Sequence, residues 1–206
     1  MDATTAIFYI AILIMSVVIH EVSHGFVAEY FGDDTARYAG RLTLNPIVHL
    51  DMFGSIILPA LLVLTSSPFL FGWAKPVPYN PNNLRDRKWG TVWVAAAGII
   101  ANFTLAIIFG LVIRLTAGLD LPPDFYFITS VIVIVNLALG LFNLIPIPPL
   151  DGSKILMSLL PPSFYKTTVF LERYSIFLLI GFIIFFSDLL FPVMAALFYL
   201  ITGQSL

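Results

Sequence analysis

The chain has no cysteine, only three histidines and very little charge. The absence of cysteine excludes disulfide bonds and metal sites built from thiolates. Charged residues make up 11% of the 206 residues, less than half of the roughly 25% found in soluble domains. The net charge is −2, and the sequence has no basic patch with interleaved aromatic residues. These absences argue against a nucleic-acid partner and against a soluble domain.

Long apolar runs take the place of the missing charge. Hydrophobic residues make up 59% of the chain, and the mean hydropathy is +0.98. Backbone groups inside a bilayer must find their partners within the protein, so this composition predicts an all-α integral membrane protein. The first apolar run has neither the basic start nor the cleavage site of a signal peptide, so we expect it to remain as a membrane helix. The sequence predicts one transmembrane domain over residues 1–206.

The apolar runs cover 6–31, 52–71, 91–115, 128–147 and 174–203. If 52–71 is re-entrant or interfacial, nine of the ten Lys and Arg residues fall on one side of the membrane. The positive-inside rule makes that side the cytoplasm. Run 174–203 is longer than the roughly 20 residues that one untilted helix needs, and Ser187-Asp188 and Pro192 are candidates for a break. The sequence thus predicts a multi-pass helical bundle in the cell membrane, with the number of C-terminal spans left open.

A cluster of ionisable residues, His20-Glu21-Val22-Ser23-His24, lies inside the first apolar run. On a helix, His20 and His24 are one turn apart on the same face and can bind one metal ion. Glu21 can then reach a water molecule on that ion and act as its general base. A central Asp, Lys or Arg costs roughly 2.5–3.5 kcal/mol in a membrane helix. His and Glu are costly there too, so ionisable residues clustered in a membrane helix predict a functional site.

A catalytic zinc ion needs three protein ligands and an open position for water. Without cysteine, the third ligand must be His, Asp or Glu. Asp151 is the best candidate, because it follows an apolar run in the proline-rich segment 143–152, where an irregular backbone can line a cavity. His49 and Asp51 remain alternatives.

Two other features are candidates for substrate binding. Residues 39–44 alternate polar and apolar side chains before Asn45-Pro46, which predicts a short strand. Leu42 and Leu44 on that strand could hold an extended substrate by strand addition. Asn102 lies one turn after Gly98 on a small-residue face, and both a role in the site and a role in helix packing fit it.

Taken together, these motifs resemble the site-2 protease family of intramembrane zinc metalloproteases, peptidase family M50, in its compact branch without PDZ or CBS domains. The resemblance rests on His20–His24, Arg41–Pro46, Gly72–Pro78, Ala97–Asn102 and Asn143–Gly152. It implies that His20, His24 and Asp151 bind one Zn²⁺ per chain and that Glu21 is the catalytic base. It also implies that Asn143 contacts the substrate backbone or the oxyanion, and that a membrane-associated β-hairpin near residues 39–45 holds the substrate.

The implied activity is hydrolysis of peptide bonds within or near transmembrane segments of membrane proteins, at a site that opens toward the cytoplasm. An intramembrane metal transporter is an alternative, but it predicts polar ligands spread along a path through several helices. A non-proteolytic membrane adaptor is another, and it would not need His20, Glu21, His24 and Asp151 together. The expected partners are the lipid bilayer and a substrate with a transmembrane helix; the oligomeric state is not predicted.

Overall fold

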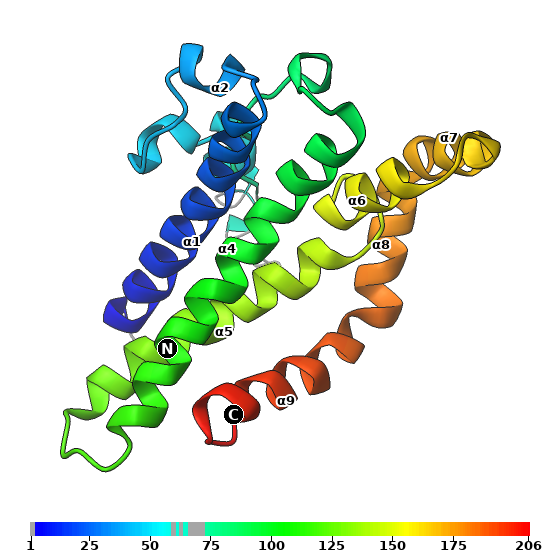
Figure 1. Cartoon of the computed structure of the whole chain (residues 1–206). Coiled ribbons are helices and arrows are strands. Elements are labelled where there is room, and N and C mark those ends of the chain that lie inside the picture. The colour runs from blue at the N-terminus through cyan, green and yellow to red at the C-terminus, as the bar shows by residue number, and fades with distance from the viewer. Residues whose placement is uncertain (1–2, 59–60, 62–63, 66–72) are drawn as a thin grey trace.

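A computed structural model of the chain describes residues 3–58, 61, 64–65 and 73–206. Three long helices form its centre (Figure 1): α1 (Ala3–Tyr30), α4 (Arg87–Thr116) and α5 (Pro123–Leu144). The shorter helices are α2 (Thr35–Tyr38), η1 (Pro46–His49), η2 (Met52–Ile57), η3 (Pro81–Asn83), α6 (Asp151–Leu159), η4 (Pro162–Phe164), α7 (Tyr165–Arg173), α8 (Ser175–Phe186), η5 (Ser187–Leu189) and α9 (Leu190–Thr202). All elements in these residues are helical, which confirms the predicted helical class.

Three helices in the described residues are long and apolar enough to cross a membrane: Thr5–Tyr30, Arg87–Thr116 and Pro123–Leu144. A fourth crossing arises if the helices Pro162–Arg173 and Ser175–Phe186, bent by 71° against each other, count as one span. The predicted C-terminal run is broken into α8, η5 and α9, and the polar pair Ser187-Asp188 stands at the break. The chain is a multi-pass membrane protein by these lengths and compositions.

Helix α4 lies between α1 and α5 and contacts both (Figure 1). Its small residues allow this, because they let neighbouring helix backbones come close in a membrane. Ala106, for example, is fully buried against Val133 and Leu137 of α5, and Phe198 of α9 completes the same cluster. The apolar packing of α4, α5 and α9 leaves the face of α4 toward α1 free to build a polar site.

The strand predicted at residues 39–44, and with it the β-hairpin, is wrong. Gly40 takes a left-handed conformation (φ 64°), and its amide donates to Arg37 O to close α2. Asn45 then caps η1 by accepting from the Ile47 amide. Only four residues lie between these two caps, and they form no strand, although their side chains alternate between polar and apolar. Leu42 packs against Gly25 of α1 instead.

Half of the predicted re-entrant segment 52–71 lies outside the described residues. Its first part forms η2, capped by Asp51, whose carboxylate accepts from the amides of Phe53 and Gly54. The amide of Trp73 donates to Gly54 O at 3.2 Å, and the Ser55 hydroxyl donates to Trp73 O. The chain that leaves at η2 therefore returns beside it at Trp73.

Residues 73–80, which we call the strap, form an extended segment that returns from η2 to the end of α1. Asp33, fully buried, fixes the far end of the strap by accepting from the Asn80 amide and the Asn83 side chain. Burial opposes ionisation of Asp33, but the hydrogen bonds from Thr35, Asn80 and Asn83 outweigh burial and hold its pKa below the ordinary value. The anchored strap crosses the polar face of α1.

Candidate metal centre

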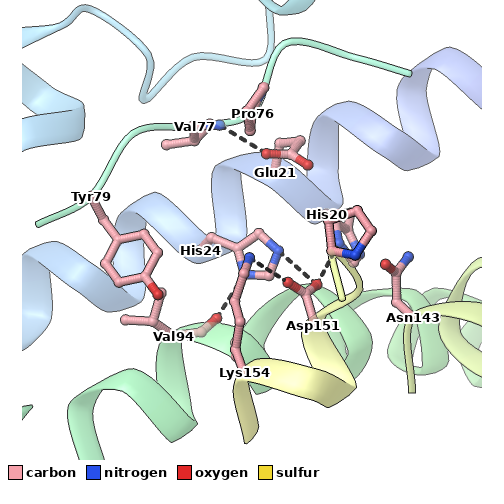
Figure 2. A pocket seen from close by; sticks show the side chains of 12 residues that line it. His20, Glu21, His24, Pro76, Val77, Tyr79, Val94, Asn143, Asp151 and Lys154 are labelled. Atoms are coloured by element: carbon pink, nitrogen blue, oxygen red, sulfur yellow. Dashed lines mark hydrogen bonds and ion pairs between the residues drawn. The ribbon is translucent and has the colours of Figure 1, made fainter. Parts of the chain in front are cut away.

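Three of the predicted ligands meet in one place (Figure 2). Asp151 Oδ2 lies 3.0 Å from His20 Nε2 and 3.1 Å from His24 Nε2. All three residues are buried, with 6%, 7% and 4% of their surfaces exposed for His20, His24 and Asp151. Helix α1 and a residue far along the chain thus contribute to one cluster, since His20 and Asp151 are 131 positions apart in the sequence.

The local sequence explains why Asp151 reaches this point. Three prolines at 146, 148 and 149 cannot continue helix α5, so the chain turns back and starts α6 at Asp151. A carboxylate in the first turn of a helix is favoured by the helix dipole. Gly152 permits the close return, since a Cβ there would lie 2.2 Å from Leu144 O.

Hydrogen bonds to α4 fix how each histidine presents its ring. His24 Nδ1 lies 2.6 Å from Val94 O, and a carbonyl oxygen only accepts, so Nδ1 carries the proton. His20 Nδ1 lies 2.6 Å from Asn102 Oδ1, which also only accepts. In both rings the lone pair is therefore on Nε2, the atom that faces Asp151.

The donor set fits a metal ion. Two Nε2 lone pairs and a carboxylate oxygen are all acceptors, and acceptors about 3 Å apart repel one another unless a cation lies between them. Ligands at ~2.0–2.1 Å from a tetrahedral zinc ion are ~3.3 Å apart, close to the 3.0 and 3.1 Å between Asp151 and the histidines. Ligand atoms of His20, Glu21 and His24 also lie within 4.8 Å of one another. Nitrogen and oxygen ligands of this kind suit zinc.

Glu21 lies beside the cluster and contacts the strap. Its Oε2 accepts from the Val77 amide at 2.8 Å (Figure 2). The strap is in turn held by the Lys75 amide, which donates to His49 O, and by Arg41, which donates to Lys75 O. The Val77 contact could not be predicted from the sequence, because every residue except proline has a backbone amide.

The alternative ligands do not join the cluster. His49 is buried under the strap, where its Nε2 lies 2.9 Å from Thr43 O and its Nδ1 lies 3.4 Å from Arg41. Asp51 caps η2. Both residues are used to shape the segment that precedes the strap.

Lys154 contacts Asp151 and was not among the residues predicted from the sequence. It stands one turn after Asp151 on α6, and its Nζ lies 3.0 Å from Asp151 Oδ1 (Figure 2). Asp151 therefore turns one oxygen to the lysine and the other to the histidines, which leaves a single oxygen for a metal ion. A lysine at i+3 from an acidic residue on a helix was the signal that could have found it.

A cavity of about 140 Å³ opens beside the cluster. Its lining consists of His20, Glu21, His24, Pro76, Val77, Tyr79, Val94, Ala95, Asn143, Pro149, Asp151 and Lys154. Asn143 lies on its edge and donates to Leu139 O at 3.1 Å. Asn102 lies behind His20, fully buried and outside this lining. The cavity brings the predicted base, ligands and Asn143 around one space.

We expect Gly98→Ala to weaken metal binding by about tenfold or more, as loss of an outer-shell partner does. A Cβ at Gly98 would lie 2.5–2.6 Å from Cε1, Nδ1 and Nε2 of His20, so the ring would have to move. The helix itself tolerates the change, because Ala is favoured over Gly by ~1 kcal/mol in helix interiors. The measurement is zinc affinity by chelator competition.

Gly181→Ala on α8 is the matched control, because nothing lies within 4 Å of a Cβ there. Equal zinc affinity in the two variants would contradict the idea that the close approach of α4 sets the position of the His20 ring.

Two histidines and a glutamate on one membrane helix of a multi-pass protein, with an aspartate brought to them from the start of the short helix α6, are typical of intramembrane metalloproteases. The model of peptidase family M50 matches residues 123–187. The chain is 41% identical over 181 residues to "Putative zinc metalloprotease YwhC" of Bacillus subtilis (strain 168), covering 84% of this chain and 75% of that protein. The chain belongs to peptidase family M50, which confirms the resemblance seen in its sequence.

Two more distant relatives carry similar names. The chain is 30% identical over 148 residues to "Putative zinc metalloprotease Rip2" of Mycolicibacterium smegmatis (strain ATCC 700084 / mc(2)155), covering 71% of this chain and 54% of that protein. It is 26% identical over 149 residues to "Zinc metalloprotease MJ0392" of Methanocaldococcus jannaschii, covering 72% of this chain and 33% of that protein. No solved structure matches the chain.

Proposed function

We propose that this protein is an intramembrane zinc endopeptidase that hydrolyses peptide bonds within or near transmembrane segments of membrane proteins. The observation that carries the proposal is the convergence of His20 Nε2, His24 Nε2 and Asp151 Oδ2 beside the carboxylate of Glu21. Membership of family M50 and the names of the relatives support it. We propose one zinc ion per chain, because these ligands form one cluster within the described part of the chain.

In this proposal each residue has a separate task. His20, His24 and Asp151 would hold the zinc ion, which, when bound, supplies a Lewis acid and lowers the pKa of a water molecule toward ~7. Glu21 takes a proton from the attacking water and returns it to the leaving amine as the C–N bond breaks. The Val77 amide donates to Glu21 Oε2 and orients the carboxylate for this work.

The substrate must reach the cavity in an extended form, because a helix shields its own carbonyl groups. We propose that Asn143, at the edge of the cavity, contacts the substrate backbone. Leu42 and Leu44 remain proposed substrate contacts, although no strand edge is present at residues 39–44. The basic residues near this end of the bundle, including Lys75 and Lys154, support an opening toward the cytoplasm by the positive-inside rule.

Metal transport is not favoured by the arrangement. A transporter needs ligands along a path, whereas the intramembrane ligands of the described residues form one cluster with a base beside it. An adaptor would not need Glu21 at the spacing of a base. Proteolysis uses every member of the cluster.

The proposal predicts that zinc removal abolishes cleavage. The purified protein in detergent should contain one zinc ion per chain, and a chelator should remove both the metal and the cleavage of a transmembrane substrate. Added Zn²⁺ should restore both, whereas Mg²⁺ and Ca²⁺ should not, because they prefer cages of oxygen ligands. Cleavage that continues in zinc-free protein would overturn the proposed function.

A further inference from the structure

A line of buried hydrogen bonds leads from the metal centre into the bundle. Behind His20, Asn102 Nδ2 donates to Asn136 Oδ1 at 2.8 Å. Asn136 Nδ2 in turn donates to Ile132 O and to the Ser16 hydroxyl, both at 2.9 Å. Asn102 and Asn136 are fully buried. We call Asn102, Asn136 and the carbonyl of Ile132 the relay.

Each hydrogen bond of the relay has a fixed donor and a fixed acceptor, and the Ile132 carbonyl at the far end determines which group is which. The Ile132 carbonyl only accepts, so Asn136 must turn its NH₂ group toward Ile132 and its Oδ1 toward Asn102. Asn102 must then give its NH₂ group to Asn136 and its Oδ1 to His20. An oxygen at that position requires the proton of His20 to be on Nδ1. The Nε2 lone pair is thereby directed at Asp151.

We infer that Asn136 is a positioning residue that, through Asn102, holds His20 in the tautomer able to bind zinc; the inference rests on the proposed function. Asp151 favours the other tautomer of His20. Its Oδ2, 3.0 Å from His20 Nε2, would accept a proton from Nε2 and so favours the other tautomer. If the Asn102 amide turned over, its NH₂ group would suit that tautomer and Nε2 would be lost to the metal. Asn136 prevents this turn.

His24 shows why the relay is needed at His20. The Nδ1 proton of His24 goes directly to a backbone carbonyl, Val94 O, which cannot turn over. His20 has only a side-chain amide, whose two ends differ little in shape, so the amide itself must be oriented. The two ligands therefore reach the same tautomer by different means, one fixed by the backbone and one by two asparagines.

The test compares Asn136→Leu with Thr129→Val. Leu has the same branching and the same number of side-chain heavy atoms as Asn, and it removes the acceptor that orients Asn102. Thr129 lies on the same helix and is also buried, and its hydroxyl donates to carbonyls of its own helix, at Phe125 and Tyr126. Zinc affinity, measured by chelator competition, should fall about 10–100-fold in Asn136→Leu, as for other outer-shell partners. It should change less than about twofold in Thr129→Val.

A second readout separates the relay from a general loosening of the fold. The chain has only three histidines, so ¹⁵N-histidine NMR of the zinc-loaded protein can follow each Nδ1 proton. In Asn136→Leu the Nδ1 proton of His20 should exchange with water at least about tenfold faster. The Nδ1 proton of His24, which is held by Val94 O, should be unchanged and serves as an internal control.

The inference is overturned if Asn136→Leu keeps the zinc affinity of the wild type, or if both Nδ1 protons lose protection equally. Neither result touches the proposed function, which fails only if wild-type protein cleaves without zinc. A selective change at His20 together with weaker zinc binding supports the relay.

Discussion

Glu21→Gln is expected to reduce cleavage by about 10²–10⁴-fold, the range over which general acid–base catalysis acts, while zinc stays bound. The amide is close in size to the carboxylate and can still contact the strap, but it cannot take a proton from water. His20, His24 and Asp151 keep their mutual contacts without it. The measurement is cleavage of a transmembrane substrate together with the zinc content of the same preparation.

Glu29→Gln is the matched control on the same helix. Glu29 pairs with Arg37 at the end of α1, outside the cavity lining, so its neutralisation should leave cleavage close to that of the wild type. Loss of zinc from Glu21→Gln would show that Glu21 is a ligand, and undiminished cleavage would remove it as the base.

Asp151→Asn is expected to lower zinc affinity by more than the roughly 10–100-fold typical of an outer-shell partner, and to abolish cleavage at ordinary zinc levels. Two effects add. The metal loses its only charged ligand in the cluster, and Lys154, 3.0 Å from Asp151 Oδ1, loses the charge that neutralises its ammonium group. The unpaired ammonium then repels a divalent cation.

Zinc titration of the purified variant measures this effect, and Asp120→Asn is its control. Asp120 is exposed in the turn between α4 and α5, so the same chemical change there should leave zinc affinity as it is. Wild-type zinc affinity in Asp151→Asn would mean that the third ligand is another residue.

Much of this arrangement could be predicted from the sequence, because its cause is local. A run of apolar residues predicts a membrane helix, and the spacing of His20 and His24 places both rings on one face of α1. Asp151 could be proposed as the third ligand because the prolines before it end a membrane helix, and because a chain without cysteine needs His, Asp or Glu in that role. The structure brings these three together and leaves His49 and Asp51 elsewhere.

What the sequence did not predict depends on how separate elements are placed. The partner of Asn136 is decided by the register of α4 against α5, and no pattern within either helix contains it. The same is true of the Val77 amide on Glu21. The strand prediction at 39–44 was wrong for another reason. Alternating side chains do not supply a neighbouring strand to pair with, and Gly40 and Asn45 cap the helices on either side of this segment.

The two hydrogen bonds that the histidines make to α4 also connect activity to correct assembly in the membrane. One turn of a helix is a rise of about 5.4 Å, so a slip of α1 against α4 by one turn would break both 2.6 Å contacts, to Val94 and to Asn102, at the same time. A bundle inserted in the wrong register would lack a metal centre. Catalytic activity therefore depends on correct packing of α1 against α4, and a misassembled copy would be inactive.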